Sequence, residues 1–256
     1  MSKKFNNKIY IHNSVNKNMK RGQVTHFIIA GLIIIIAIVL VLFARSEYLK
    51  NLYEEQRTKL VGLPADIKPI EDYVQECIDL SAPIAKDVIA LQGGYAYPNE
   101  SIDIAIANVA YWYDKKDISP SINIIENQMS IYFKDLVENC IKGFNDTNYI
   151  INIKGFNSKF TIKENDIFVA VNMPMEINYK DITFELDKFN TRFKSDFLNV
   201  YEAARTIVLS IEENPDVIDV TLLSNLGYDV NYFEFDEEIV YVVSGEDTDV
   251  YFANRF

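Results

Sequence analysis

Histidine is nearly absent from this chain of 256 residues, and its placement excludes several classes of enzyme. The two histidines, His12 and His26, both precede residue 45. The rest of the chain therefore cannot build a Ser-His-Asp or Cys-His catalytic centre or an HExxH metal site, and no GxxxxGK[ST] or GxGxxG pattern occurs. A carboxylate-dependent hydrolase is the remaining alternative, but 37 acidic residues single out no pair. We expect a protein that is not an enzyme and has no cofactor.

Cysteine is equally scarce, with only Cys77 and Cys140 in the sequence. Two cysteines are too few for a four-sulfur structural zinc site. Each lies in a predicted helix, and in an oxidising, extracytoplasmic compartment two such residues form a disulfide, here closing a loop of about 63 residues. The alternative is a pair of buried thiols on apolar helix faces.

Charge is absent from one long stretch, Gly22 to Ala44, which is bracketed by Lys20-Arg21 and Arg45. About 20 apolar residues at 1.5 Å per residue cross the ~30 Å hydrocarbon layer of a bilayer. The run is longer than the apolar core of a cleaved signal, and no Ala-x-Ala pattern follows it before Arg45. The sequence therefore predicts a membrane anchor, with a transmembrane helix at 23–44.

The charges that flank this run predict its orientation. Segment 1–22 carries six basic residues and no acidic residue, and basic flanks stay in the cytoplasm. We therefore expect a single-pass cell-membrane protein with a cytoplasmic N-terminus and an extracytoplasmic C-terminal domain at 65–256. Without those six residues the chain has 19 basic and 37 acidic residues. So acidic a domain repels nucleic acid and anionic lipid headgroups and attracts cations or basic surfaces.

The helix is predicted to continue beyond the membrane as an amphipathic stalk at 45–64. Tyr48, Leu49, Leu52 and Tyr53 form one apolar stripe at helical spacing. Gly62-Leu63-Pro64 then ends the helix.

The domain at 65–256 contains segments with the helical period of about 3.6 residues and segments with the two-residue period of strands, so it is predicted to be α+β. About three helices are expected, near 70–91 (kinked or divided at Pro83), 119–142 and 190–213. Alternating apolar residues predict strands at 102–107, 228–235, 239–243 and 249–252. Segment 148–187 is predicted to be an antiparallel meander with turns at 157–158 and 164–166. Helices segregated from antiparallel strands are typical of α+β domains.

Three groups of residues in this domain are candidate sites. One is an aromatic group that could bind sugars or a partner surface, although packing in a strand and core is the preferred interpretation: Tyr95, Tyr97, Tyr111, Trp112 and Tyr113. Asp247 and Asp249 offer oxygen ligands suited to Ca²⁺ but lack the remainder of an EF-hand loop, so a solvated acidic face is the alternative. Asn99 and Asn145 begin N-x-[ST] glycosylation sequons.

Lys20-Arg21-Gly22-Gln23 before the apolar run resembles the class III signal peptides of archaeal type IV pilin-like proteins. The resemblance covers about six residues plus the run, and implies cleavage between Gly22 and Gln23 with retention of the apolar helix. Many such pilins carry an acidic residue at the fifth mature position, where this chain has Phe27. Gln92-Gly93-Gly94-Tyr95, downstream of a cysteine-bearing helix, resembles uncharacterised archaeal membrane-anchored proteins, which implies no activity.

These observations predict a membrane-anchored cell-surface protein with a structural or adhesive role, such as a pilin-like subunit. Its expected partners are the lipid bilayer and other cell-surface proteins or copies of itself. The alternative is a tethered extracytoplasmic binding or sensor module, or an accessory subunit of an envelope complex.

Overall fold

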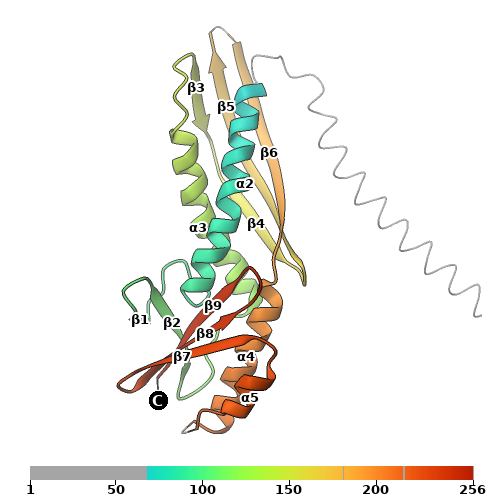
Figure 1. The fold of residues 1–256 in the computed structure, drawn as a ribbon. Helices are drawn as coiled ribbons and strands as arrows, with labels where there is room; N and C mark the ends of the chain where they lie inside the picture. The colour runs from blue at the N-terminus through green and yellow to red at the C-terminus, as the bar shows by residue number, and fades with distance from the viewer. Residues whose placement is uncertain (1–67, 181, 216, 256) are drawn as a thin grey trace, which may run out of the picture. The chain divides into compact units, whose positions relative to one another are not determined.

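The computed structural model of the protein describes residues 68–180, 182–215 and 217–255, all within the unit Ala65–Phe256 (Figure 1). The predicted cytoplasmic segment 1–22, transmembrane helix 23–44 and stalk 45–64, with the candidate processing residues Gly22 and Gln23, lie outside these residues and stay predictions. Among the described residues, no helix has both the length and the apolarity needed to cross a bilayer.

The described unit is α+β, as the sequence predicted. Its helices and strands follow one another as α2 (Lys68–Leu91), β1 (Ser101–Asp103), β2 (Asn108–Asp114), α3 (Ile122–Lys142), β3 (Tyr149–Ile153), β4 (Asn157–Ile162), β5 (Asp166–Tyr179), β6 (Ile182–Lys194), α4 (Phe197–Glu213), α5 (Val220–Asn225), β7 (Asp229–Phe235), β8 (Glu238–Ser244) and β9 (Asp249–Arg255).

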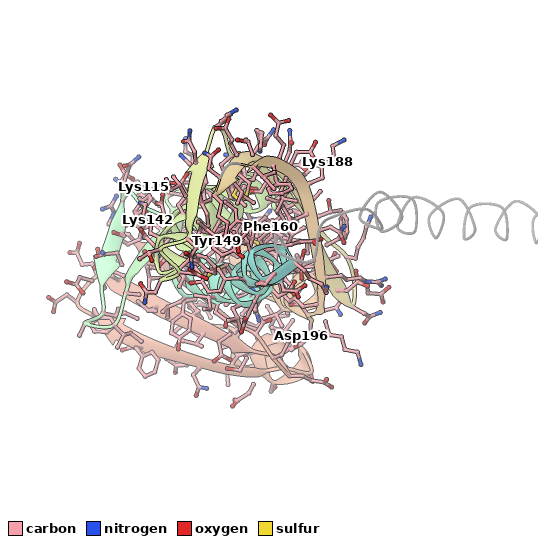
Figure 2. All side chains as sticks on the ribbon, turned by 90° about the horizontal axis from the view of Figure 1, so that it is seen from above. Lys115, Lys142, Tyr149, Phe160, Lys188 and Asp196 are labelled. Carbon is pink, nitrogen blue, oxygen red and sulfur yellow. A yellow bond between two sulfur atoms is a disulfide. The ribbon has the colours of Figure 1, made fainter. Side chains whose placement is uncertain are left out.

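Helices α2 and α3 pack on each other and on one face of a four-stranded sheet (Figure 1). The buried residues of α3 recur every four positions, from Ile125 through Phe133 to Ile141, so the helix presents one apolar stripe to the sheet. Phe160 of β4 meets the ring of Phe133 edge-on at 5.3 Å between centroids. The end-on view in Figure 2 shows Phe160 inside this layer and the exposed Lys188 outside it.

The four-stranded sheet is antiparallel and is organised around β5. Strands β3 and β4 pair with successive halves of β5, while β6 pairs along its whole length on the other side. The β5–β6 register shifts between Asn172 and Met175, and Pro174 lies in this irregular stretch. Proline cannot donate to a ladder, so a bulge is where a central strand can hold one. The Pro174 carbonyl still accepts a hydrogen bond from the Lys154 N–H at 2.8 Å.

The second sheet has five strands in the order β1-β2-β9-β8-β7 and contacts α4 and the α2 helix. Trp112 of β2 is fully buried, stacks on Phe252 at 4.8 Å and meets Tyr201 of α4 at 5.7 Å between ring centroids. Its indole N–H donates to the Gly93 carbonyl at 2.8 Å. Gly93 follows α2 with a φ of 69°, a conformation that glycine adopts without steric cost, and so brings the end of α2 against β2.

Five expectations about these elements were wrong at least in part. Helix α2 is one helix through Pro83 and is not divided there. The predicted strand 102–107 ends at Asp103, because Ala105 has a φ of 68°, and the chain turns into β2. Residues 157–158 begin β4 instead of forming a turn, and the helix expected at 190 begins at Phe197 because β6 extends to Lys194. Strand β2 pairs parallel with β9, so the strands are not all antiparallel.

Candidate functional site

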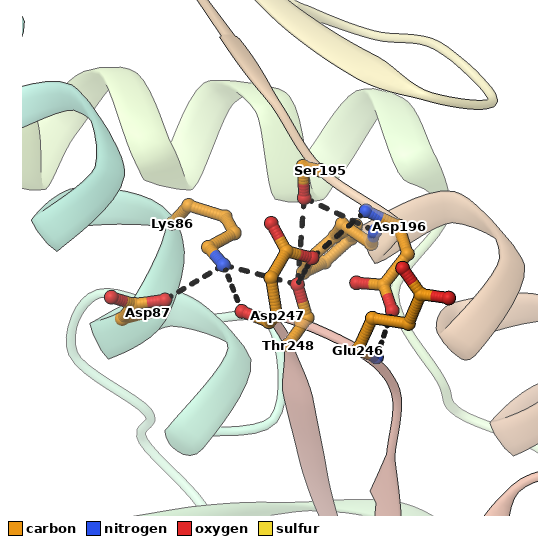
Figure 3. Close-up of polar contacts among 8 residues, drawn as sticks. Lys86, Asp87, Ser195, Asp196, Glu246, Asp247 and Thr248 are labelled. Carbon is orange, nitrogen blue, oxygen red and sulfur yellow. Dashed lines mark hydrogen bonds and ion pairs between the residues drawn. The ribbon is translucent and has the colours of Figure 1, made fainter.

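A buried polar cluster lies where α2, the β6–α4 connection and the β8–β9 turn meet (Figure 3). Its central residue is Lys86, which lies among alanines and isoleucines on the buried face of α2. The β8–β9 turn supplies Asp247 and Thr248, and the β6–α4 connection supplies Ser195 and Asp196. Residues from three distant parts of the sequence therefore converge here.

The Lys86 ammonium is buried but fully partnered. Its side chain is only 4% exposed. Nζ donates to the Asp247 carbonyl at 2.7 Å and to Thr248 Oγ1 at 3.0 Å, and it pairs with Asp87 Oδ1 at 2.8 Å. An ammonium group has three protons, and these three acceptors match them. Burying a charge is costly unless it is paired and hydrogen-bonded, and this geometry meets both conditions.

Two hydroxyl groups continue the network from Lys86 toward helix α4. Ser195 Oγ lies 3.4 Å from Thr248 Oγ1 and accepts a hydrogen bond from the Phe197 N–H at 3.2 Å. Phe197 is the first residue of α4, whose first backbone N–H groups have no partner within the helix. The network therefore satisfies the beginning of α4 and joins it to the turn that holds Lys86.

Asp196 and Asp247 form a carboxyl pair beside this network. The Asp196 N–H donates to Asp247 Oδ1 at 3.0 Å, and Asp196 Oδ2 accepts from the Glu246 N–H at 2.5 Å. Burial raises the pKa of the Asp196 carboxyl above its ordinary value, and the adjacent Asp247 carboxyl raises it further. Burial also acts to raise the pKa of Asp247, but hydrogen bonds from Asp196 and the charge of Lys86 lower it below its ordinary value. The two carboxyl groups therefore differ in proton affinity, and Asp196 binds a proton more strongly than Asp247 does.

Gly245 makes the close approach of the turn to Asp196 possible. A Cβ atom at this position would lie 2.1 Å from Asp196 Oδ2 and 2.5 Å from Val200 Cγ2. Any side chain would therefore push the turn away from the start of α4. The contact is steric, so the sequence around Gly245 gives no sign of it.

An open cavity of about 660 Å³ borders Asp196 on its outer side. Oxygen and amide groups from Asn165, Asn199, Asp229 and Glu246 line it together with Asp196. Among the described residues, no three His, Cys, Asp or Glu side chains converge closely enough to hold a metal ion. Asp249, the other predicted Ca²⁺ ligand, begins β9 and pairs with Ser244. The cavity is thus polar, and Ca²⁺ binding by Asp247 and Asp249 stays a prediction.

The chemistry available to this cluster is limited by its geometry. Asp247 Oδ1 accepts the backbone N–H of Asp196, and Asp196 Oδ2 accepts the backbone N–H of Glu246, so both carboxyl groups are engaged in holding the chain segments together. A nucleophilic lysine needs a free amine, and the Lys86 ammonium already meets three acceptors. The arrangement is therefore suited to joining α2, α4 and the five-stranded sheet.

The structure separates the aromatic residues that the sequence grouped together. Tyr111, Trp112 and Tyr113 are buried in β2, which removes them from any partner surface. Tyr95 is half-buried, and Tyr97 is 62% exposed and donates from its hydroxyl to Asp135. Core packing thus accounts for the β2 aromatics, and only Tyr97 offers an exposed face.

The remaining predicted sites among the described residues are the cysteine pair and the two glycosylation sequons. Cys77 and Cys140 form a disulfide that joins α2 to α3, which confirms the predicted pairing. Asn99 and Asn145 are both exposed in loops, so the two sequons are accessible for glycosylation. Sequence reasoning missed Lys86 and Asp196. A lysine on the apolar face of α2 was the available signal for Lys86, whereas Asp196 was one carboxylate among many.

Comparisons with known proteins add no family assignment. No family model, no curated protein and no solved structure matches this chain.

Replacing Asp196 with asparagine is expected to stabilise the protein at neutral pH. A group whose folded-state pKa is raised contributes stability that is complete below its ordinary pKa, here 3.8, and is lost as the pH rises through the raised value. Asparagine is neutral at every pH and can donate to Asp247. The melting temperature of Asp196→Asn should therefore exceed that of the wild type at pH 7, and the difference should vanish near pH 3.

The matched control is Asp249→Asn, which removes an exposed carboxylate two residues beyond Asp247. Its melting-temperature difference from the wild type should not follow this pH profile. A variant Asp196→Asn that is less stable than the wild type at pH 7 would show that Asp196 is needed in its charged form.

Proposed function

We propose that this protein is a membrane-anchored cell-surface protein with a structural or adhesive role, such as that of a pilin-like subunit. The observation that carries the proposal is the uncharged segment Gly22–Ala44 between Lys20-Arg21 and Arg45. It supplies an anchor and an orientation, with the folded unit outside the cytoplasm. The basic-Gly-Gln order before the segment supports processing between Gly22 and Gln23.

The folded unit supports an oxidising location independently of the N-terminal segment. Both cysteines of the chain are joined in the Cys77–Cys140 disulfide, and such bonds persist in extracytoplasmic compartments and are rare in reducing ones. Exposed sequons at Asn99 and Asn145 agree with that location.

Phe27 favours the second candidate function, a tethered extracytoplasmic binding module or accessory subunit. It occupies the fifth position after Gly22, where many archaeal pilins carry an acidic residue. A tethered module requires neither cleavage at Gly22 nor assembly. The two functions therefore predict different N-termini for the mature protein and different sedimentation, as assemblies or as monomers.

The proposal is tested on the native protein in its own cells. Mass spectrometry of the mature chain should find Gln23 at the N-terminus, and sheared surface material should sediment as assemblies. Protease added to intact cells should digest the unit beyond residue 65. An intact Met1 start with monomeric sedimentation would favour the tethered module, and full protection from protease would contradict both functions.

A further inference from the structure

The five-stranded sheet has an open edge at strand β7. Strand β7 is the last strand of that sheet and pairs with β8 through all seven of its residues without a register shift. Its other edge has no strand partner among the described residues. A regular edge strand presents unpaired backbone N–H and C=O groups on which another extended chain can add.

Two other edge strands, β6 and β4, carry basic residues that discourage strand addition, whereas β7 carries none. The exposed β6 strand has Lys188, Arg192 and Lys194, and β4 has Lys159. Lysines on edge strands commonly block the pairing of sheets. Strand β7 contains neither lysine nor proline, and the opposite edge strand, β1, is only three residues long.

Strand β7 also exposes aromatic rings to solvent. Tyr232 is 41%, Phe233 is 54% and Phe235 is 42% exposed. Because successive side chains alternate, Phe233 and Phe235 lie on one face of the strand, and Tyr232 and Glu234 lie on the other. An added strand would therefore meet apolar rings on one face and a carboxylate on the opposite face.

The charge around this edge indicates what can add to it. Between Arg205 and Arg255 the chain has twelve acidic residues and no lysine, arginine or histidine. Glu234, Asp236 and Glu237 are exposed on β7 and the turn that follows it. A second copy of β7 would bring two such acidic edges together, and like charges oppose that pairing. A basic strand has no such cost.

We propose that the β7 edge is a binding site for an extended basic segment of a partner protein, in which basic and apolar residues alternate. The segment adds antiparallel to β7, with its apolar residues beside Phe233 and Phe235 and its basic residues beside Glu234. Backbone hydrogen bonds provide affinity, and the alternation provides specificity. This interaction goes beyond the proposed anchoring and display role and does not depend on cleavage at Gly22.

The test uses the full-length protein in nonionic detergent and a fluorescent peptide of four Lys-Val repeats. Binding is measured by anisotropy, and hydrogen exchange locates the protected amides. We expect the peptide to bind, to protect residues 229–235 and to bind more weakly as salt increases, because the charges are exposed and screened. A Glu-Val peptide of the same length should not bind.

The variant Phe233→Lys should weaken binding of the Lys-Val peptide at least tenfold, since it removes a ring and adds a repelling charge. Glu234→Lys, at another exposed position, should act in the same direction. The matched control is Ile150→Lys, because Ile150 is 66% exposed on β3, an edge strand of the other sheet, and this variant should bind as the wild type does.

Four results would overturn the proposal. They are equal binding of the Glu-Val peptide, protection outside β7, an unchanged affinity in both β7 variants, and no binding up to about 1 mM peptide. Protection of residues 229–235 that rises with protein concentration in the absence of peptide would instead identify the occupant as a second copy.

Discussion

Replacing Lys86 with methionine should lower the free energy of unfolding by about 2–4 kcal/mol. Methionine fills the same space but leaves the Asp247 carbonyl and Thr248 Oγ1 without their donor. The loss is smaller than for a pair buried on both sides, because Asp87 is 63% exposed and regains water. For a folded unit of this size the melting temperature should fall by roughly 5–10 °C. Urea unfolding of the full-length protein followed by circular dichroism measures the change.

Lys68→Met provides the matched control on the same helix. Lys68 pairs with Asp72 at 3.2 Å, but its side chain is 71% exposed, so the pair contributes little, on the order of 0.5 kcal/mol or less. A Lys86→Met variant as stable as Lys68→Met would show that the network does not hold α2 against the β8–β9 turn.

Removing the disulfide with Cys77→Ala and Cys140→Ala together should cost roughly 4 kcal/mol of stability. The bond closes a loop of 63 residues, and the chain-entropy model assigns about this value to a loop of that length. The loop contains all of β1, β2 and most of α3, so the cross-link restrains much of the unfolded chain. Equilibrium unfolding in urea without reductant, compared with the wild type, measures the difference.

Reductant separates this effect from the loss of two sulfur atoms in the core. It should lower the stability of the wild type toward that of the double variant and leave the double variant unchanged. Thiol titration of denatured, unreduced wild-type protein should find no free sulfhydryl. Two reactive thiols per chain would contradict the disulfide.

The elements most accurately predicted from the sequence are those with strong periodicity and clear ends. Helix α3 was expected near 119–142, and its apolar residues recur every four positions until Gly143 ends it. Strands β7 to β9 were also predicted close to their observed bounds. Residues 157–158 were misassigned because polar side chains resemble a turn, although here they lie at the beginning of β4. Helix α5 was missed because six residues are too few to show a helical period.

The candidate site was only partly predictable. The cysteine pairing was predicted from composition, since each of the two cysteines has only the other as a partner for a disulfide within the chain. The carboxyl pair did not, because Asp196 and Asp247 are 51 residues apart and differ in no local feature from other acidic residues. For the aromatic residues of β2, core packing was preferred over a partner surface, and the burial of Trp112 against Tyr201 confirms the core.

By itself, the sequence determined the α+β class and the absence of histidine chemistry beyond residue 45, because these depend on composition and on periodicity along the chain. It also predicted the cysteine pairing, which the structure confirms, and a membrane anchor at 23–44, which stays a prediction. Only the tertiary structure decided that β2 pairs parallel with β9, that Lys86 meets the β8–β9 turn, and that β7 is left as an open edge. Each of these depends on contacts between segments that are far apart in the chain. The free energy of such contacts cannot be inferred from the local sequence pattern of either segment.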